Sequence, residues 1–321
     1  MTAGEQCATR DTRLSRRVRP WIVRQFLRLM AAAAIGLAAG SVFLAENALR
    51  VPDHSHALPG YGQAFARAAG AEVEEVRVRA GDGAWLAGWL FTPAHPNGAA
   101  AIVLHGVGDT RLGVLGQARF LLDAGYTVLT PDNRGHGASS GVMITYGLLE
   151  AGDVHTWASL VLARPGIRRL YGAGQSMGAA ILIESLGREP RFCALAADCP
   201  FATFEEVARD RLSQQGLRLV SWPVIETGFL YARLRYGFDL WSASPAEALR
   251  RSSTPVLLIH GTADTNIPIR HSRELHTLNP RTTELWEVAG AEHVSSIGRD
   301  PAEYARRVTA FFAAHAESSQ K

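Results

Sequence analysis

Hydrophobic and polar residues alternate in segment 73–79, which predicts a β-strand, and the mainly apolar segment 85–92 predicts a second strand. Gly81, Asp82 and Gly83 separate the two segments, a combination that favours a tight hairpin turn. Short apolar runs without alternation follow at 99–104, 127–130, 169–173, 193–197, 256–259 and 283–288. Uninterrupted runs of this kind are typical of parallel strands that are buried on both faces.

Helical periodicity separates these runs. It covers segments 112–124, 148–163, 177–187, 267–278 and 301–316. Pro301 suits the first turn of the last of them. Strands that alternate with helices give a mainly parallel sheet with helices on both faces. We therefore expect an α/β fold whose eight-stranded sheet opens with a hairpin.

The alternation breaks once, between residues 200 and 249. This segment has helical texture and is too long for an ordinary loop, so we expect a small helical cap over the strand ends. Its aromatic residues are Phe201, Phe204, Trp222, Phe229, Tyr231, Tyr236, Phe238 and Trp241. They either pack the cap's own core or line a pocket, and the sequence favours neither interpretation.

The N-terminal segment predicts a membrane anchor. Residues 29–45 contain no charge and follow a block of arginines that ends at Arg28. As a helix this run is about 26 Å long, close to the bilayer core of about 30 Å. The basic flank places the N-terminus in the cytoplasm and the rest of the chain outside it. A cleaved signal peptide with Ala38 and Gly40 at its cleavage site is the alternative, in which case the protein is secreted.

The domain organisation follows from these features. We assign 1–50 to the basic N-terminus and transmembrane anchor, and 51–72 to a spacer with one short helix around 63–69. Residues 73–316 form the globular domain, with the cap inserted at 200–249.

Composition narrows the function classes. The chain has 321 residues, of which 47% are hydrophobic and 20% charged, values that exclude a disordered protein. The net charge of +3 comes from the first fifty residues, so no basic face is expected on the folded domain, and nucleic acid is not an expected partner. Three cysteines cannot build a disulfide framework. Cys193 and Cys199 flank one predicted strand and are expected to be buried thiols.

The pattern Gly-x-Ser-x-Gly occurs twice, at 137–141 and at 174–178. A nucleophilic serine in this motif sits on a tight turn between a strand and a helix, with small neighbours that let the two elements approach. Ser176 follows a predicted strand and precedes a predicted helix. Ser139 lies in a run of Gly, His and Ser that we interpret as a loop. We therefore predict Ser176 as the nucleophile; a glycine-rich packing turn is the alternative.

A serine hydroxyl needs a histidine base that is held by a carboxylate. Asp264 follows the strand at 256–259, and His293 follows the last predicted strand. Asp198 also follows a strand and is the alternative acid. We favour Asp264 because it lies in a loop just before a helix, from which its carboxylate can reach an imidazole in the next loop. Asp198 is instead expected to hold its own turn through backbone hydrogen bonds. The chain order Ser176, Asp264, His293 is that of the α/β-hydrolase fold.

These motifs resemble the α/β-hydrolase superfamily from residue 73 to about 315. The block at 131–137, together with Gln175 and the segment 198–201, is similar to N-terminally anchored members often labelled serine aminopeptidase-like or lysophospholipase-like. Cys199 departs from this pattern, because a serine is expected there. The resemblance implies hydrolysis of an acyl bond. An oxyanion hole needs two backbone donors: the amide after the nucleophile, Met177, and, by the resemblance, that of Val107.

The other histidines and cysteines give no sign of a metal or cofactor. His105, His136 and His260 lie at strand ends or in loops, and we expect them to hold those loops by hydrogen bonds. No His, Cys and Asp residues have metal-ligand spacing. The glycine-rich turn at 172–176 lacks the lysine of a phosphate loop. We expect neither metal nor cofactor.

The sequence therefore predicts a serine hydrolase tethered outside the cytoplasmic membrane, acting on small-molecule carboxylic esters or thioesters. An aromatic cap with few charges favours an apolar acyl group. An aminopeptidase is the first alternative, and it would need acidic groups at the pocket mouth; Glu205, Glu206 and Glu226 lie in the cap. A non-catalytic binding module on the same scaffold is the second.

Overall fold

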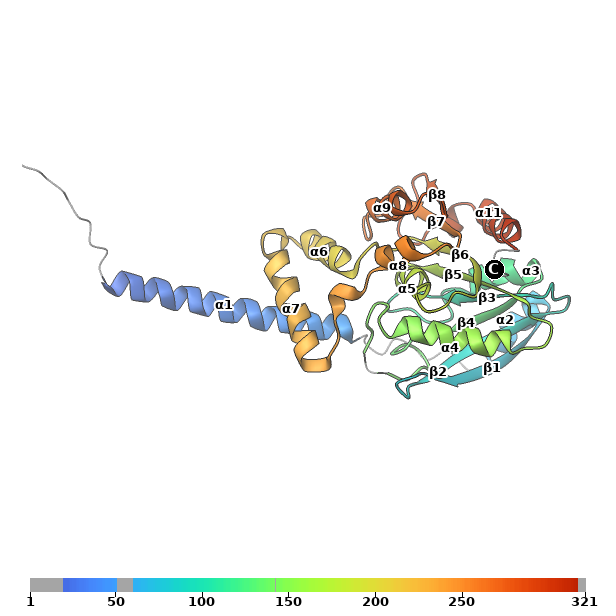
Figure 1. The fold of residues 1–321 in the computed structure, drawn as a ribbon, viewed down its shortest axis with the longest axis horizontal. Coiled ribbons are helices and arrows are strands. Elements are labelled where there is room, and N and C mark those ends of the chain that lie inside the picture. Colours follow the sequence, from blue (N-terminus) through green and yellow to red (C-terminus); the bar gives the residue numbers. More distant parts are fainter. Residues whose placement is uncertain (1–19, 51–59, 142, 317–321) are drawn as a thin grey trace, which may run out of the picture.

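The computed structural model describes residues 20–50, 60–141 and 143–316. One sheet of eight strands, ordered β1-β2-β4-β3-β5-β6-β7-β8, runs through the domain (Figure 1). The strands are β1 (Ala71–Arg79), β2 (Trp85–Pro93), β3 (Ala99–Leu104), β4 (Thr127–Pro131), β5 (Arg169–Gln175), β6 (Phe192–Asp198), β7 (Val256–Gly261) and β8 (Thr283–Val288). β2 pairs antiparallel with both β1 and β4, and the other neighbours are parallel. The predicted eight-stranded sheet that opens with a hairpin is confirmed.

Helices cover both faces of the sheet. The helices of the described residues are α1 (Pro20–Leu49), α2 (Tyr61–Ala69), α3 (Leu115–Asp123), α4 (Glu150–Leu162), α5 (Met177–Ser185), α6 (Phe204–Gln214), α7 (Ser221–Tyr236), α8 (Pro245–Arg251), α9 (Arg270–Leu278), α10 (Ser296–Arg299) and α11 (Pro301–Ala314), with short 3-10 turns η1 (Arg218–Val220) and η2 (Leu240–Ser242). Residues of α4, α5, α8 and α9 pack on one face, and residues of α2, α3 and α11 on the other.

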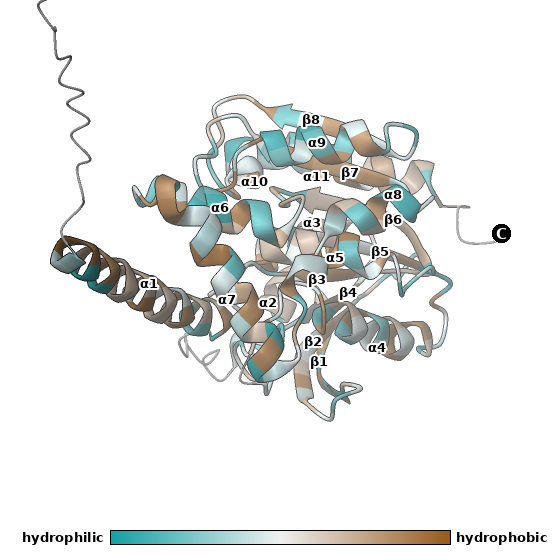
Figure 2. Ribbon diagram, turned by 60° about the vertical axis from the view of Figure 1, so that its left-hand side comes forward, coloured by the Kyte–Doolittle hydropathy of each residue, from teal (hydrophilic) through white to brown (hydrophobic). Residues whose placement is uncertain are grey.

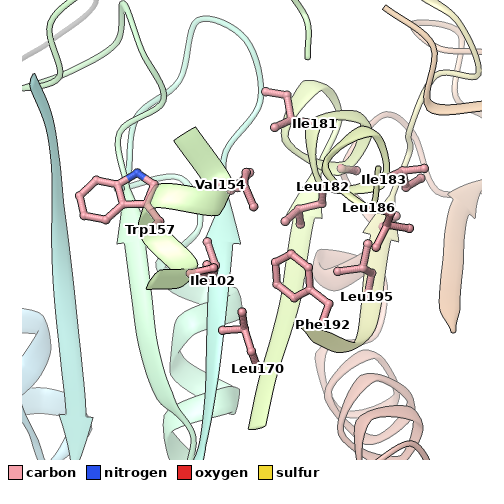
Figure 3. Packing of buried hydrophobic residues seen from close by; sticks show 14 of the residues in the cluster. Ile102, Val154, Trp157, Leu170, Ile181, Leu182, Ile183, Leu186, Phe192 and Leu195 are labelled. Atoms are coloured by element: carbon pink, nitrogen blue, oxygen red, sulfur yellow. The ribbon is translucent and has the colours of Figure 1, made fainter. Parts of the chain in front are cut away.

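The period of two along the central strands places the core on both faces. In β3, Ile102 belongs to the cluster under α4 and α5, while Val103 belongs to the cluster under α3 and α11. Figure 3 shows the first cluster, which contains Ile102 and Leu170 of the sheet and Trp157 of α4. Leu182 of α5 belongs to the same cluster. Complete burial of each such side chain contributes about 1.5–3 kcal/mol, which fixes α5 on the sheet.

Helix ends follow local signals. Pro301 is the first residue of α11, as predicted, and Asp300 caps this helix by accepting the amide of Glu303 at 3.0 Å. The helix predicted from residue 267 instead begins at Arg270. The preceding amides of Asn266 and Ile267 donate to a carboxylate rather than entering the helix.

The cap consists of α6, η1, α7 and η2 and lies over the carboxyl ends of β3 and β5. Its core is a set of aromatic rings, with Phe204 stacked between Tyr146 and Phe229 at centroid distances of 3.8 and 5.4 Å. The carboxyl ends of parallel strands are where ligands bind in such sheets.

α1 is longer than the uncharged run, because it begins at Pro20 and includes Arg24 and Arg28. Within the described residues it is the one helix long and apolar enough to cross a membrane. Most of it is exposed and projects from the domain, while its last turns lie against α7 (Figures 1 and 2). The basic block before Pro20, Cys7 and residues 51–59 of the spacer lie outside the described residues.

Candidate active site

Ser176 lies on a tight turn between β5 and α5. Its backbone has φ 55° and ψ −122°, a conformation that residues other than glycine rarely adopt. The two glycines of the motif make this turn possible. A Cβ on Gly174 would lie 2.8 Å from the backbone of Gly178, and a Cβ on Gly178 would lie 2.4 Å from the carbonyl oxygen of Leu104. The spacing Gly-x-Ser-x-Gly is thus the steric condition for packing β5, α5 and β3 together at the serine.

The structure brings together the three residues that the sequence predicted. His293 Nε2 lies 2.9 Å from Ser176 Oγ, and His293 Nδ1 lies 2.7 Å from Asp264 Oδ2. An ionised carboxylate can only accept, so Nδ1 carries the imidazole hydrogen. Nε2 is then free to accept the hydrogen of the serine hydroxyl. This tautomer is the one that a general base needs.

The carboxylate of Asp264 is held ionised by its surroundings. Burial favours the neutral form, but hydrogen bonds from His260 and His293 outweigh it and hold the pKa of Asp264 well below its usual range. Its other oxygen accepts the amides of Asn266 and Ile267 at 2.8 and 2.9 Å. The loop after β7 therefore folds around this carboxylate and fixes its direction.

Asp198, the alternative acid, has other partners. Its Oδ1 accepts the hydroxyl of Ser296 at 3.0 Å and the thiol of Cys199 at 3.3 Å. Burial raises the pKa of Asp198 to about 6. Both ring nitrogens of His293 are already engaged by Ser176 and Asp264, so Asp198 links β6 to α10 rather than to the imidazole.

The amides of Met177 and Val107 flank the serine. Met177 is the first residue of α5, where backbone N–H groups have no partner within the helix. Val107 lies in the loop after β3, and this loop contacts the turn: a Cβ on Gly106 would lie 3.2 Å from the Cβ of Ser176. Both residues line the cavity that opens at Ser176.

Two buried histidines hold the Val107 loop, as the sequence predicted for loop histidines. His136 Nε2 accepts the amide of Gly108 at 3.1 Å, and His105 Nε2 accepts the amide of Asn133 at 3.0 Å. Burial, assisted by the neighbouring His136, lowers the pKa of His105 to about 4, and burial also lowers the pKa of His136. Both rings are therefore neutral acceptors at pH 7.

The second Gly-x-Ser-x-Gly motif is a loop, as expected. Ser139 Oγ accepts the amide of Ala87 at 2.9 Å and donates to the carbonyl oxygen of Asp132 at 2.7 Å. These bonds tie the loop to β2 and to the end of β4. The structure places no helix at this serine.

A cavity of about 360 Å³ opens at Ser176 beneath the cap. Its lining is mainly apolar and includes Phe201, Phe204 and Phe229. Other cap aromatics serve elsewhere: Tyr231 hydrogen-bonds to α1, and Trp222 is exposed. The cap aromatics therefore divide between the pocket wall and structural contacts.

Comparisons with known proteins identify the family of the chain. A model of the "Alpha/beta hydrolase family" matches residues 101–307, more than half of the chain. The chain belongs to this family.

Individual relatives span most of the hydrolase domain. The chain is 31% identical over 229 residues to the uncharacterized protein YqkD of Bacillus subtilis, covering 70% of this chain and 74% of that protein. It is 28% identical over 208 residues to the lysophosphatidylserine lipase ABHD12 of Danio rerio, covering 61% and 50%. Among solved structures, the Pyrococcus furiosus esterase Pf2001 superposes with a TM-score of 0.66 at 25% identity, covering 84% and 98%.

Sequence reasoning missed a cluster of three buried side chains whose ligand atoms lie close enough together to hold a metal ion. One ligand atom each from Cys199, His260 and Asp264 lies within 4.8 Å of the others. His260 already bonds to Ser272 Oγ at 2.7 Å and to the carbonyl oxygen of Ile267 at 2.8 Å. Burial raises the pKa of the Cys199 thiol far above its usual range, so the thiolate that binds metals is disfavoured. The group is better explained as packing behind Asp264.

Sequence reasoning also missed the contribution of α1 to the cavity. Its lining residues are Ser41, Leu44, Ala45, Asn47, Ala48 and Leu49. Five of these positions repeat at intervals of three and four, which places them on one helix face. That spacing was the signal available in the sequence.

Proposed function

We propose that this α/β-hydrolase is a serine hydrolase that cleaves carboxylic esters or thioesters through an acyl-enzyme. Ser176 is the nucleophile, His293 the general base and Asp264 the group that orients it. The observation that carries the proposal is the hydrogen-bonded line from Asp264 Oδ2 through His293 to Ser176 Oγ, with links of 2.7 and 2.9 Å.

In the proposed reaction Ser176 Oγ attacks the carbonyl carbon while its proton moves to His293 Nε2. The amides of Met177 and Val107 donate to the negative oxygen of the tetrahedral intermediate. His293 then gives the proton to the departing alcohol or thiol as the intermediate collapses to the acyl-enzyme. Water, deprotonated by the same imidazole, repeats the sequence and releases the acid.

The lining of the cavity supports an apolar acyl group rather than a free amine. Among its described lining residues the charged side chain is that of Arg211, and no carboxylate is present. Glu205, Glu206 and Glu226 are not part of the wall, and Glu205 is paired with Arg209. An aminopeptidase would need an acidic group there, so the ester or thioester activity is favoured. The esterase and lipase names of two relatives support the same choice.

We also propose that α1 anchors the domain outside the cytoplasmic membrane. Supporting this, α1 is a helix of 30 residues that is long and apolar enough to cross a membrane. The alternative is a secreted protein after signal cleavage.

The experiment that tests the activity is a panel of p-nitrophenyl esters of rising chain length, assayed beside amino-acid anilides with the wild type and Ser176→Ala. The proposal expects ester turnover that requires Ser176 and peaks at one chain length. Anilide turnover well above ester turnover would favour the aminopeptidase. Absence of any Ser176-dependent turnover or fluorophosphonate labelling would favour the binding module.

A further inference from the structure

The last turns of α1 form a wall of the cavity beside Ser176. The residues on this wall run from Ser41 to Leu49, and the facing wall comes from α6 and α7 with Phe204 and Phe229. Asn47 and Ala48 line the cavity and are exposed as well, so the cavity reaches the molecular surface along α1. An acyl group in this cavity would therefore lie against α1.

This end of α1 is fixed to the hydrolase body. The hydroxyl of Tyr146 donates to the carbonyl oxygen of Ala48 at 2.8 Å. The amide of Ile144 donates to the carbonyl oxygen of Leu49 at 2.9 Å. Tyr146 also lines the cavity and has a φ of 55°, a strained value for a bulky residue. Strain of this kind persists where the surrounding structure over-determines it, often at functional sites.

The same end of α1 is fixed to the cap. The hydroxyl of Tyr231 donates to Glu46 Oε1 at 2.6 Å, and Tyr236 bonds to the same carboxylate. α7 approaches α1 closely, since a Cβ on Gly228 would lie 3.4 Å from the Cβ of Ala45. The end of α1 is therefore bonded both to the hydrolase body and to the cap. A helix that served only as a tether would not need these contacts.

The cavity wall lies where α1 would leave the bilayer. The uncharged run 29–45 ends within the wall. Residues 20–40 are exposed except for Leu37, which is half-buried. As a helix the uncharged run is about 26 Å long, close to the bilayer core of about 30 Å, and Arg24 and Arg28 lie before it. The wall from Ser41 onward is thus at the outer boundary of the hydrocarbon layer.

The cap presents apolar side chains on η1 and α7. Leu219 is 97% exposed, Leu234 79% and Trp222 61%. Exposed basic side chains on the same elements are Arg218, Arg233 and Arg235. Apolar side chains with basic neighbours suit the interface between acyl chains and phosphate groups. The cap is thus suited to rest on the membrane surface beside α1.

We propose that the membrane helix completes the acyl-binding site, and that the substrate is an amphiphilic lipid ester that enters from the outer leaflet along α1. The inference rests on the proposed function and deepens it by naming the substrate class. The acyl chain leaves the bilayer beside Ala45 and Ala48 and passes between α1 and the cap. Its carbonyl carbon then reaches Ser176 Oγ.

Substitutions on α1 test the wall in the full-length chain in vesicles. Ala48→Phe narrows the cavity and Leu44→Ala widens it. Ala39→Phe is the matched control, because residue 39 is exposed and lies about 180° around the helix from residue 48. Fluorophosphonate labelling of Ser176 checks that each variant is folded.

The proposal expects opposite shifts in acyl-chain preference. Ala48→Phe should lower kcat/KM for esters of 14–16 carbons at least about tenfold more than for butyrate. Leu44→Ala should shift the optimum to longer chains, and Ala39→Phe should match the wild type within about twofold. An unchanged chain-length profile in both wall variants, or an equal change in the control, overturns the proposal.

A second measurement does not depend on turnover. Ser176→Ala is placed in phosphatidylcholine vesicles that contain a phosphatidylcholine with a photoactivatable diazirine in one acyl chain. The proposal expects crosslinks to α6 and to the segment around Tyr146, reduced by Ala48→Phe. Crosslinks confined to residues 20–40 overturn it. Cavity crosslinks without Ser176-dependent ester turnover in the wild type would contradict the proposed hydrolase and leave the lipid site standing.

Discussion

The amide of Ser176 donates to the carbonyl oxygen of Asp198 at 2.8 Å, so the turn of the candidate nucleophile is fixed to the end of the neighbouring strand. The side chain of Asp198 continues this connection to Ser296 at the start of α10, directly after the loop of His293. One residue thus connects the backbone positions of the serine and the histidine without bonding to the imidazole. Its position explains why the sequence presents two aspartates that follow strands.

The two aspartates are expected to respond differently to substitution. Asp264→Asn should lower kcat about 10³- to 10⁴-fold, because the amide favours the wrong tautomer of His293. Asp198→Asn should lower the free energy of unfolding and leave kcat within about tenfold of the wild type. Steady-state kinetics and urea unfolding of both variants separate the roles. A well-folded, inactive Asp198→Asn would transfer the acid to β6.

The two motif serines give a matched pair of variants. Ser176→Ala should lower kcat at least about 10³-fold with little change in stability, because its hydroxyl bonds mainly to the imidazole. Ser139→Ala should retain most activity but lose about 1–3 kcal/mol of stability, since the amide of Ala87 is left without its acceptor. Kinetics and thermal unfolding measure both effects. An inactive Ser139→Ala beside an active Ser176→Ala would show that the wrong motif was chosen.

Glu184 predicts a pH dependence of stability. Burial, assisted by the nearby Glu150, raises the pKa of Glu184 from its ordinary 4.5 to about 8, and its Oε2 has no partner among the described residues. The folded chain then keeps a proton that the unfolded chain loses. This contribution to stability is complete below pH 4.5 and is lost as pH rises toward 8, with a limiting slope of about 1.4 kcal/mol per pH unit.

Glu184→Gln should remove this slope, because an amide does not ionise. Urea unfolding of the wild type and the variant at several pH values between 5 and 9 measures it. The variant should gain stability relative to the wild type as pH rises. A constant difference across this range would mean that Glu184 is not a buried neutral acid.

Membrane topology follows from α1. Full-length protein in cell membranes should resist an alkaline carbonate wash, and protease added from outside should reach the hydrolase domain. The physical reason is an uncharged helical run long enough to span the bilayer behind a basic flank. Release of a shortened soluble protein would identify a cleaved signal peptide instead.

The strands were predictable because their patterns are local. The alternation at 73–79 and the apolar runs around Ile102 and Leu195 reflect burial on one or both faces, and the structure places every strand end within two residues of the prediction. Ser176, Asp264 and His293 were predictable for a related reason. Each follows a recognisable strand, and parallel strands bring their carboxyl ends to one edge. Their chemical roles stay predictions.

The contacts of α1 could not be predicted in the same way. Tyr146 and Tyr231 are separated from Ala48 and Glu46 by about one hundred residues or more, and no local pattern encodes which side chain meets which. The start of α9 was misplaced because the Asp264 carboxylate captures the amides of Asn266 and Ile267. Long-range packing decides both features.

Peptide mass spectrometry of the full-length chain after reaction with a fluorophosphonate tests most directly whether Ser176 is an activated nucleophile. We expect a single adduct on Ser176, absent in Ser176→Ala and formed far more slowly in Asp264→Asn, because only a serine activated by His293 reacts quickly. An adduct on Ser139, or an unreactive wild type that is otherwise folded, would contradict this expectation.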